Sequence, residues 1–389
     1  MTYIGSKPAD KVLTASDITD GVVSTAKIAD NAVTADKTSY KDVPFRNILI
    51  NGDMSLAQRA TSTASITASG YYTIDRFKTN ISSAGTWTQS QSTTVPSGQG
   101  FATSLKMDCT TADGSLGAAD SLNIQQRIEG QNLQYLKKGT ASAESVTLSF
   151  WVKSNKTGTY IVELYESDNT RSISKSYTID SSDTWEQKEI TFAGDTSGAL
   201  NNDNARSLDV NFFLAAGSNF TSGTLATSWS SYTAANRAVG QVNLADSTSN
   251  EFFITGIQLE VGTTASDFEF LPYDVNLKRC QRYFQTLGFG NIAMAESGST
   301  YVMNLPHIMT MRSTPSKGLL VTSNIRVRQY GVADRDSSSP TIGSSAGSNN
   351  GSYIKVTDFG AIGDASTPAG IGYTTSSESG DLFKLDAEL

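Results

Sequence analysis

Hydrophobic and polar residues alternate along several short stretches of the chain, with the period of two that is typical of half-buried β-strands. In residues 146–153 the alternate positions are Val, Leu, Phe and Val, and the residues between them are Thr, Ser, Trp and Lys. The same alternation occurs at 160–165, and apolar residues recur at every second position in 105–109, 190–192 and 208–214. The pattern predicts strands at these places, separated by loops rich in Ser, Thr, Gly and Asn.

The stretch 252–261 (FFITGIQLEV) changes phase part-way along. Phe252 and Ile254 share one face, and the alternation resumes out of step after Gly256. An isolated glycine at such a switch predicts a β-bulge. With at least eight strands between residues 45 and 273 and long polar loops between them, the central part of the chain is expected to form a β-sandwich or jelly roll.

A helix is expected after this central part. In residues 274–287 the apolar positions Leu277, Cys280, Phe284 and Leu287 are three or four apart, which is the spacing of one helical face. Asp274 is a candidate N-cap. An alternative for the second half of this stretch is a strand that begins at Tyr283.

Alternating patterns return beyond the helix and predict a second, smaller β domain. The strands are expected at residues 301–305, 319–322, 325–329, 353–356 and 382–389. The Ser/Gly/Asn-rich stretch 336–351 is expected to be a flexible loop, and polar loops on rigid β scaffolds often carry binding residues. We therefore take this loop as a candidate receptor contact.

A ten-residue repeat lies near the N-terminus, where residues 18–27 (ITDGVVSTAK) match residues 28–37 (IADNAVTADK). One copy has too few apolar residues to bury a core alone, so an ordered repeat would pack on copies of itself or on another protein. The alternative is a disordered polar leader. The candidate attachment positions are Ile18, Val23, Ile28 and Val33.

The sequence thus predicts an all-β protein with three parts. These are an extended N-terminal stalk with decamer repeats (1–44), a central β-sandwich or jelly roll (45–273), and a short linking helix followed by a smaller β domain (274–389).

Composition and charge exclude several classes of protein. Only 17% of residues are charged, the net charge is −8, and there is no run of Lys and Arg of the kind that contacts nucleic-acid phosphates. No apolar stretch is long enough for a transmembrane helix, and the N-terminus lacks the apolar core of a secretory signal, so we expect a soluble protein made in a cytoplasm. Cys109 and Cys280 are expected to be buried thiols.

Catalytic chemistry has few candidates. His307 is the one histidine, so a Ser-His-Asp or Cys-His arrangement would have to use it. A zinc site needs several His or Cys ligands, and the sequence has too few of them. We expect no enzyme activity and no cofactor, with a structural calcium ion left open. A polysaccharide depolymerase is the weaker alternative, because paired carboxylates such as Asp180 with Asp183 or Glu163 with Glu166 could serve as glycosidase acids.

Three aromatic residues fall on the non-core faces of their predicted strands: Trp151, Tyr165 and Trp185. Aromatic rings stack on the CH face of sugars, and they are also enriched where subunits meet. The two alternatives are a glycan platform and a subunit interface.

Several segments resemble a known family. They are NILINGDMSLAQR (47–59), YYTIDRF (71–77), LNIQQRIEG (122–130), LSFWVKSNKTGTY (148–160), GIQLEVG (256–262), FEFLPYDVNLKRCQRYF (268–284) and FKLDAEL (383–389). Together with the decamer repeats, they resemble the jelly-roll module and flanking parts of bacteriophage tail-fibre proteins of phages of aquatic bacteria.

The resemblance implies a virion component on the phage tail, synthesised in the host cytoplasm. It implies a homotrimer whose N-terminus docks on the tail or on an adaptor protein and whose distal part binds a glycan or protein of the host surface, without nucleic acid or membrane insertion. It transfers no catalytic residues. The alternative is a head-decoration or tail-adaptor protein that makes no receptor contact.

Overall fold

The computed structural model describes residues 45–288, 292–297, 300–320, 325–329, 335–337, 341–357, 368–373 and 381–389. Residues Phe45–Leu389 form one compact unit. The attachment positions Ile18, Val23, Ile28 and Val33 lie outside the described residues, so the stalk and its repeats stay a prediction.

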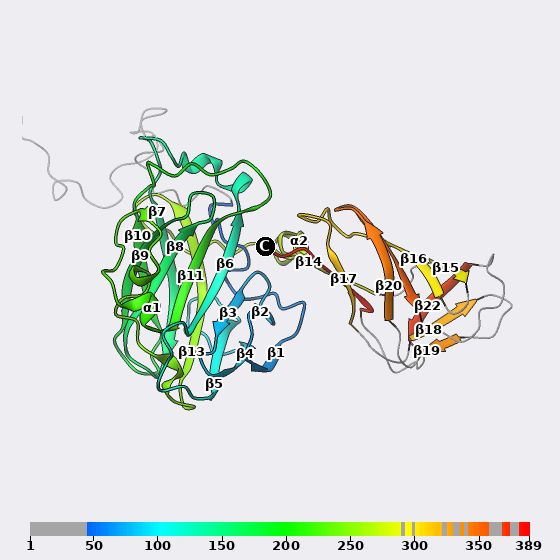
Figure 1. Ribbon diagram of the computed structural model, residues 1–389, viewed down its shortest axis with the longest axis horizontal. Helices are drawn as coiled ribbons and strands as arrows, with labels where there is room; N and C mark the ends of the chain where they lie inside the picture. The colour runs from blue at the N-terminus through cyan, green and yellow to red at the C-terminus, as the bar shows by residue number, and fades with distance from the viewer. Residues whose placement is uncertain are drawn as a thin grey trace, which may run out of the picture. The chain divides into compact units, whose positions relative to one another are not determined.

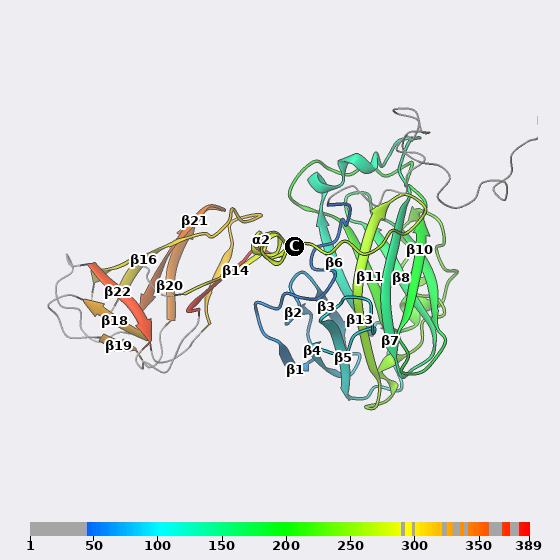
Figure 2. The same cartoon turned by 180° about the vertical axis from the view of Figure 1, so that it is seen from behind.

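The larger, N-terminal part of the described chain is a sandwich of two antiparallel sheets, seen from opposite sides in Figure 1 and Figure 2. The first sheet has the strand order β1 (Ser62–Ile66), β4 (Thr86–Ser92), β5 (Ser104–Thr111), β13 (Glu251–Val261), β7 (Val146–Ser154) and β10 (Glu186–Phe192). The second sheet has the order β12 (Ser230–Ser231), β9 (Arg171–Ile179), β8 (Gly158–Glu166), β11 (Arg206–Ala216), β6 (Ser121–Glu129), β3 (Lys78–Ser82) and β2 (Gly70–Tyr71). The chain passes repeatedly from one sheet to the other, as it does in jelly rolls.

The alternating positions of the sequence form the core between these sheets. Every second residue of β7 from Val146 to Val152 is buried in it, and so are Tyr160, Val162 and Leu164 of β8. The strands expected around residues 105–109, 190–192 and 208–214 are present as β5, β10 and β11. The all-β prediction is confirmed. Alternate residues of these strands are buried between two facing sheets, as the period of two in the sequence predicts.

The predicted β-bulge is also confirmed. The register of β13 against β7 shifts between Thr255 and Gln258, and Gly256 has φ +62°. A Cβ added to Gly256 would lie 2.5 Å from the Phe101 ring, so this position requires glycine for its conformation and for the close approach of that ring.

Short helices fill the connections of the sandwich. They are the 3-10 turns η4 (Gly130–Asn132), η5 (Gln134–Leu136), η6 (Ala234–Asn236) and η7 (Leu244–Asp246) and the single-turn α1 (Ser218–Thr221).

A second core lies in the C-terminal part, between two further antiparallel sheets. One has the order β14 (Phe284–Leu287), β23 (Phe383–Asp386), β17 (Ser316–Leu319). The other has the order β19 (Arg335–Ser337), β18 (Ile325–Gln329), β22 (Pro368–Tyr373), β15 (Ile292–Ser297), β16 (Thr300–Pro306), β21 (Gly351–Thr357), β20 (Thr341–Gly347). Tyr301, Met303 and Leu305 of β16 alternate into this core, as the sequence pattern predicts.

The predicted helix is shorter than its apolar spacing suggested. Helix α2 covers Tyr273–Gln281, and the chain then enters β14, so the strand alternative was right for the second half of 274–287. Asp274 is not the N-cap: the capping position is Pro272, and Asp274 lies in the first turn, where a carboxylate is favoured by the helix dipole.

Two other predictions in this part were wrong. The stretch expected as a flexible loop contains strand β20, at residues Thr341–Gly347, which pairs with β21. Backbone pairing needs no large side chain, so a Ser/Gly-rich strand leaves little pattern in the sequence. The strand expected at 319–322 lies earlier, at β17, and only Leu319 is common to both.

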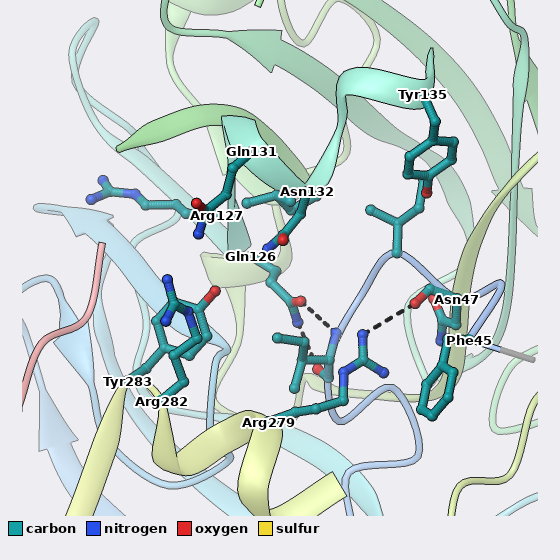
Figure 3. A pocket seen from close by; sticks show the side chains of 13 residues that line it. Phe45, Asn47, Gln126, Arg127, Gln131, Asn132, Tyr135, Arg279, Arg282 and Tyr283 are labelled. Carbon is teal, nitrogen blue, oxygen red and sulfur yellow. Dashed lines mark hydrogen bonds between the residues drawn. The ribbon is translucent and has the colours of Figure 1, made fainter. Parts of the chain in front are cut away.

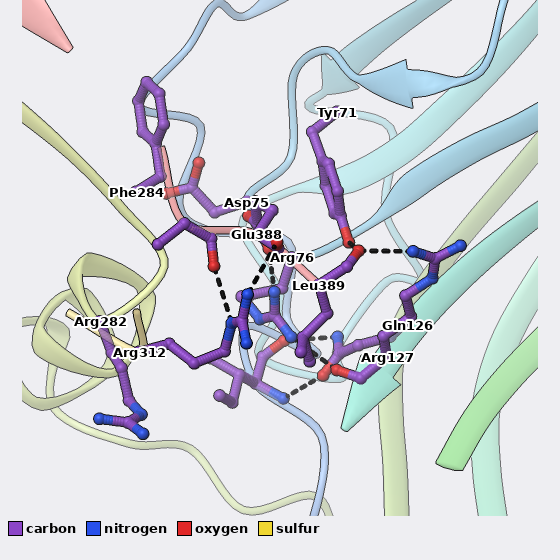
Figure 4. A network of polar contacts seen from close by, with 12 residues as sticks. Tyr71, Asp75, Arg76, Gln126, Arg127, Arg282, Phe284, Arg312, Glu388 and Leu389 are labelled. Atoms are coloured by element: carbon purple, nitrogen blue, oxygen red, sulfur yellow. Dashed lines mark hydrogen bonds and ion pairs between the residues drawn. The ribbon is translucent and has the colours of Figure 1, made fainter. Parts of the chain in front are cut away.

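The chain end packs against the sandwich through a polar network (Figure 4). Glu388 forms ion pairs with Arg59 and with the fully buried Arg76, whose guanidinium lies 3.4 Å from the ring centroid of Tyr283. The backbone oxygen of Leu389 accepts hydrogen bonds from Arg127 and from the Tyr71 hydroxyl. Residues 388–389 are therefore part of the sandwich's packing, although they follow the last strand of the second core.

Candidate binding cleft

An open cleft of about 370 Å³ lies where β6, the segment 45–50 and the end of α2 meet (Figure 3). Its rim carries two of the most exposed aromatic residues of the described chain, Phe45 at 59% and Tyr135 at 51%. Its other lining residues are Asn47, Ile48, Ile50, Gln126, Arg127, Ile128, Gln131, Asn132, Arg279, Arg282 and Tyr283. Aromatic rings beside amides and guanidinium groups suit a polar ligand with an apolar face.

The floor of the cleft is held by Gln126 of β6. Its side-chain oxygen accepts from the Ile50 backbone N–H at 2.7 Å, and its side-chain nitrogen donates to the Ile50 carbonyl at 2.9 Å. The amide therefore pairs with the backbone as a neighbouring strand would. Because Gln126 is buried and both of its polar atoms are used, its role is to fix the floor.

One wall is the turn that follows β6. Leu133 and Leu136 are buried in the sandwich core, so Tyr135 between them faces outward. The turn also depends on Gly130, where an added Cβ would lie 2.0 Å from the carbonyl oxygen of Asn201. Tyr135 is thus presented to solvent by a turn that is anchored on both sides.

The opposite wall is the end of α2 and the residues after it. Arg282 makes a bidentate pair with Glu129, with N–O distances of 2.8 and 2.7 Å. Burial acts to raise the pKa of Glu129, but the hydrogen bonds from Arg282 outweigh it, and the pKa is lowered. The same hydrogen bonds raise the pKa of Arg282, so this ion pair joins α2 firmly to the end of β6.

Arg279 is bound more loosely. It reaches from α2 to the middle of the cleft, between Gln126 and Asn47 (Figure 3), and donates to the Asn47 backbone oxygen at 3.3 Å. Burial lowers the pKa of Arg279 despite the attraction of Glu269. The two carboxylate oxygens of Glu269 accept from the backbone N–H groups of Phe45 and Asn47.

Three of the segments that carry the family resemblance meet at this cleft. Residues 47–59 supply the floor, residues 122–130 supply β6 and Glu129, and residues 268–284 supply α2 with Arg279 and Arg282. The sequence alone does not show that these segments lie together, because the contacts between them join residues that are 76 to 232 positions apart. The exposed Tyr135 follows the second segment and carried no signal of its own.

The structure brings two of the three predicted aromatic residues onto the first sheet. Trp151 lies on β7 opposite Gln187 and Thr255, on the face away from the core. Trp185 precedes β10, and its ring packs edge-on against Phe253 with 6.3 Å between centroids. Lys153 and Lys106 cover Phe253, with ammonium nitrogens 4.5 and 5.5 Å from its centroid. Both tryptophans are half-buried.

Tyr165 lies on β8 in the second sheet, so the three rings do not form one platform. It packs against Tyr232 at 5.5 Å and under the Arg206 guanidinium. Beside it a polar row crosses five strands of the second sheet, and neighbouring members lie opposite one another in register: Ser174, Glu163, Asn211, Gln125 and Lys78.

The side chains of this polar face bind one another. Glu163 receives two hydrogen bonds from Arg237, at 2.8 and 2.6 Å, and one from Asn211 at 2.9 Å. Gln125 donates to Asp209 and Asn211, and Arg206 pairs with Asp209. Glu163 and Asp209 are fully buried, so the carboxylates serve the packing of this face.

The histidine and the two cysteines of the chain are held by contacts within the fold. The ring nitrogens of His307 lie 2.9 Å from the Asn349 carbonyl oxygen and from the Ser352 hydroxyl. Cys109 and Cys280 are free and buried, as predicted. Within the described ranges, no three His, Cys, Asp or Glu side chains come together in a way that could hold a metal ion.

Helices that could span a membrane are absent from the part of the chain that the structure describes.

No protein-family model matches the sequence, and no curated protein is significantly similar to it. The solved structures to which the chain is similar include the enzymatically active domain of tailspike protein 4 of bacteriophage CBA120, at 15% identity and TM-score 0.29. That match covers 57% of this chain and 22% of the tailspike chain. A CBM61 module bound to β-1,4-galactotriose matches at 12% identity and TM-score 0.27, over 56% of this chain and 99% of the module.

A family 11 carbohydrate-binding module from Clostridium thermocellum matches at 15% identity and TM-score 0.26, over 53% of this chain and 98% of the module. Likenesses at this level assign no function, so a function has to rest on the residues of the cleft and on the sequence.

Proposed function

We propose that this chain is a bacteriophage tail-fibre protein that attaches the virion to a glycan of the host surface. The glycan binds in the cleft, where it stacks on Tyr135 and Phe45 and meets the amide and guanidinium groups behind them. No bond is made or broken in this role, so we propose an adhesin and not an enzyme.

The cleft carries this proposal. Two exposed aromatic rings flank a concave, polar-walled space, and an apolar surface rimmed by polar groups is typical of a ligand-binding groove. A pyranose ring has an apolar face for stacking and hydroxyl groups that exchange hydrogen bonds with amides. The resemblance of the sequence segments to tail-fibre proteins points to the same role.

The rest of the tail-fibre role follows from the sequence. The decamer repeat of residues 18–37 docks the N-terminus on the tail, and three copies of the chain assemble, so that weak sites gain avidity by being linked. The outward face with Trp151 and Trp185 is our candidate for the contact between copies, because aromatic residues anchor such contacts.

A direct test uses the purified full chain on host cells. The protein should bind intact cells, should compete with phage adsorption, and should lose binding when surface polysaccharide is removed from the cells. Undiminished binding to cells from which the polysaccharide has been removed would contradict a glycan receptor. Absence of all binding, with the protein located on the capsid by imaging, would favour a head-decoration or adaptor protein.

Deletion of residues 1–40 tests the docking role. The β-sheets should keep their stability, because their cores begin after residue 45, while incorporation into particles should be lost. Unchanged incorporation would remove the attachment role from the repeat.

Replacing Trp151 with Ala separates the two roles of the outward aromatic face. A product that becomes monomeric in analytical ultracentrifugation supports a subunit contact, and an intact oligomer that loses cell binding supports a glycan platform. Release of reducing ends from host polysaccharide by the unmodified protein would instead reveal a depolymerase.

A further inference from the structure

The cleft has a pronounced positive character. Three arginines line it, Arg127, Arg279 and Arg282, and among the described residues that line it none is Asp or Glu. The whole chain has the opposite balance, with a net charge of −8. A local excess of arginine on an acidic protein marks a place where an anion is favoured.

The three arginines differ in how far their charge is already compensated. Arg282 is held by both oxygens of the buried Glu129, so its donors are largely used. Arg127 donates to the Gln125 side chain and to the Leu389 backbone oxygen. Arg279 has the weakest contact, one 3.3 Å hydrogen bond to a backbone oxygen.

The surroundings of Arg279 leave its positive charge incompletely stabilised. Burial lowers its pKa, and burial together with the nearby Arg206 lowers the pKa of Arg127. A guanidinium placed in a partly desolvated cleft gains most from an ionised oxygen acceptor, because hydrogen bonds between charged groups are about twice as strong as neutral ones. The planar guanidinium also matches two oxygens of one acid group.

We infer that the glycan bound in the cleft is acidic, and that an oxyanion on its sugar ring is held by Arg279 while the ring stacks on Tyr135. The shared chemistry is a sugar carrying a carboxylate or a sulfate ester. This inference rests on the proposed function, since it names the class of glycan that the same cleft selects.

The experiment measures binding of the full-length protein to matched oligosaccharides by isothermal titration calorimetry. The probes are oligogalacturonate, sialylated and sulfated oligosaccharides, each beside its neutral counterpart, which is the carboxyl-reduced, desialylated or desulfated form. We expect at least one acidic probe to bind about 10- to 100-fold more tightly than its neutral counterpart, the range for one hydrogen bond to a charged group. The advantage should shrink as salt is raised.

Arg279→Gln should abolish that preference, because the variant loses more affinity for the acidic probe than for its neutral counterpart, by the same factor of about 10 to 100. Lys278→Gln is the matched control, because it removes one positive charge from the same helix at an exposed position and should keep the preference. Thermal unfolding of both variants verifies that α2 still packs. Arg279→Lys should recover part of the preference, since it restores the charge without the planar donors.

The outcomes separate this inference from the proposed function. Neutral probes that bind as tightly as acidic ones overturn the acidic ligand and leave a glycan adhesin standing. Equal losses for acidic and neutral probes in Arg279→Gln show that Arg279 only shapes the wall, which also overturns the inference. A protein that binds host cells but no polysaccharide contradicts both.

Discussion

The cleft and the polar face of the second sheet contain the same kinds of residue but use them differently. On the polar face, Arg237 and Arg206 pair with buried carboxylates, and Asn211 is linked by hydrogen bonds to Glu163 and Gln125. In the cleft, Arg279 has only a backbone oxygen as hydrogen-bond acceptor, and the aromatic rings are exposed. In the first arrangement the charged groups are paired with one another within the protein, whereas the second leaves a guanidinium and aromatic rings available to a ligand.

The difference shows that residue type alone does not mark a binding site. Arg, Asn, Gln and Tyr occur at both places. A buried polar group that is hydrogen-bonded within the protein contributes to the fold, and replacing its partner leaves it unpaired. We therefore expect changes on the polar face to reduce stability and changes in the cleft to reduce binding.

The largest expected effect is on the polar face. Arg237→Ala leaves the fully buried Glu163 without its bidentate partner. Removing one partner of a buried ion pair costs about 3–5 kcal/mol of unfolding free energy. Guanidinium chloride unfolding followed by circular dichroism should show this loss, while the affinity for the glycan is unchanged.

The double variant Arg237→Met with Glu163→Gln is the control. It removes both charges, so most of the lost stability should return. A loss below about 1 kcal/mol in Arg237→Ala would mean that Glu163 is solvated, and the contrast between the two regions would fail.

An intermediate case is Asp75, a buried carboxyl in the network of Figure 4. It accepts two hydrogen bonds from Gln58 and lies 3.6 Å from Arg59. Burial outweighs these partners and raises the pKa of Asp75 from 3.8 to about 6. Arg59 and Gln58 stabilise the charged form of Asp75 only in part against the cost of burial, so the free energy of unfolding depends on pH.

Between pH values of about 4 and 6, the folded chain holds a proton on Asp75 that the unfolded chain has lost. Its contribution therefore makes the protein less stable as the pH rises through this window. Asp75→Asn removes the contribution, so the variant should gain roughly 1–3 kcal/mol relative to the unmodified protein across the window, at 1.36 kcal/mol per unit of pKa. Urea unfolding at several pH values measures it, and parallel curves for the two proteins would contradict the raised pKa.

The sandwich was largely predictable because period-two alternation is a local property of the chain. The strands around Val146–Val152 and Tyr160–Leu164 follow directly from it. β20 was missed because a strand rich in Ser and Gly is specified by its pairing with β21, which a single sequence does not display. The spacing of Phe284 and Leu287 favours a helix, but both residues lie in β14, so pairing with β23 decided the structure of this segment.

The candidate site was less predictable for a related reason. Trp151, Tyr165 and Trp185 were selected by phase within their own strands, but phase does not say which sheet a strand joins, and Tyr165 lies in the other sheet. The cleft depends on contacts between segments far apart, such as Glu129 with Arg282. The sequence contained these segments as separate motifs and gave no register between them.

The smallest expected effect on stability is that of removing the Tyr135 ring, and this variant compares the cleft with the polar face directly. Tyr135→Ala removes a half-exposed ring at the cleft rim, so the free energy of unfolding should change by no more than about 0.5 kcal/mol, as for other surface substitutions. Stacking of an aromatic ring contributes about 0.5–1.5 kcal/mol, so glycan affinity should fall by roughly 2- to 10-fold.

Tyr165→Ala is the matched variant on the polar face. It removes the edge-to-face contact with Tyr232 and the ring beneath Arg206, so it should lower stability by about 1–2 kcal/mol and leave glycan affinity unchanged. Thermal unfolding and calorimetric titration of the two variants measure both quantities in each. A loss of affinity in Tyr165→Ala with none in Tyr135→Ala would move the binding site from the cleft to the second sheet.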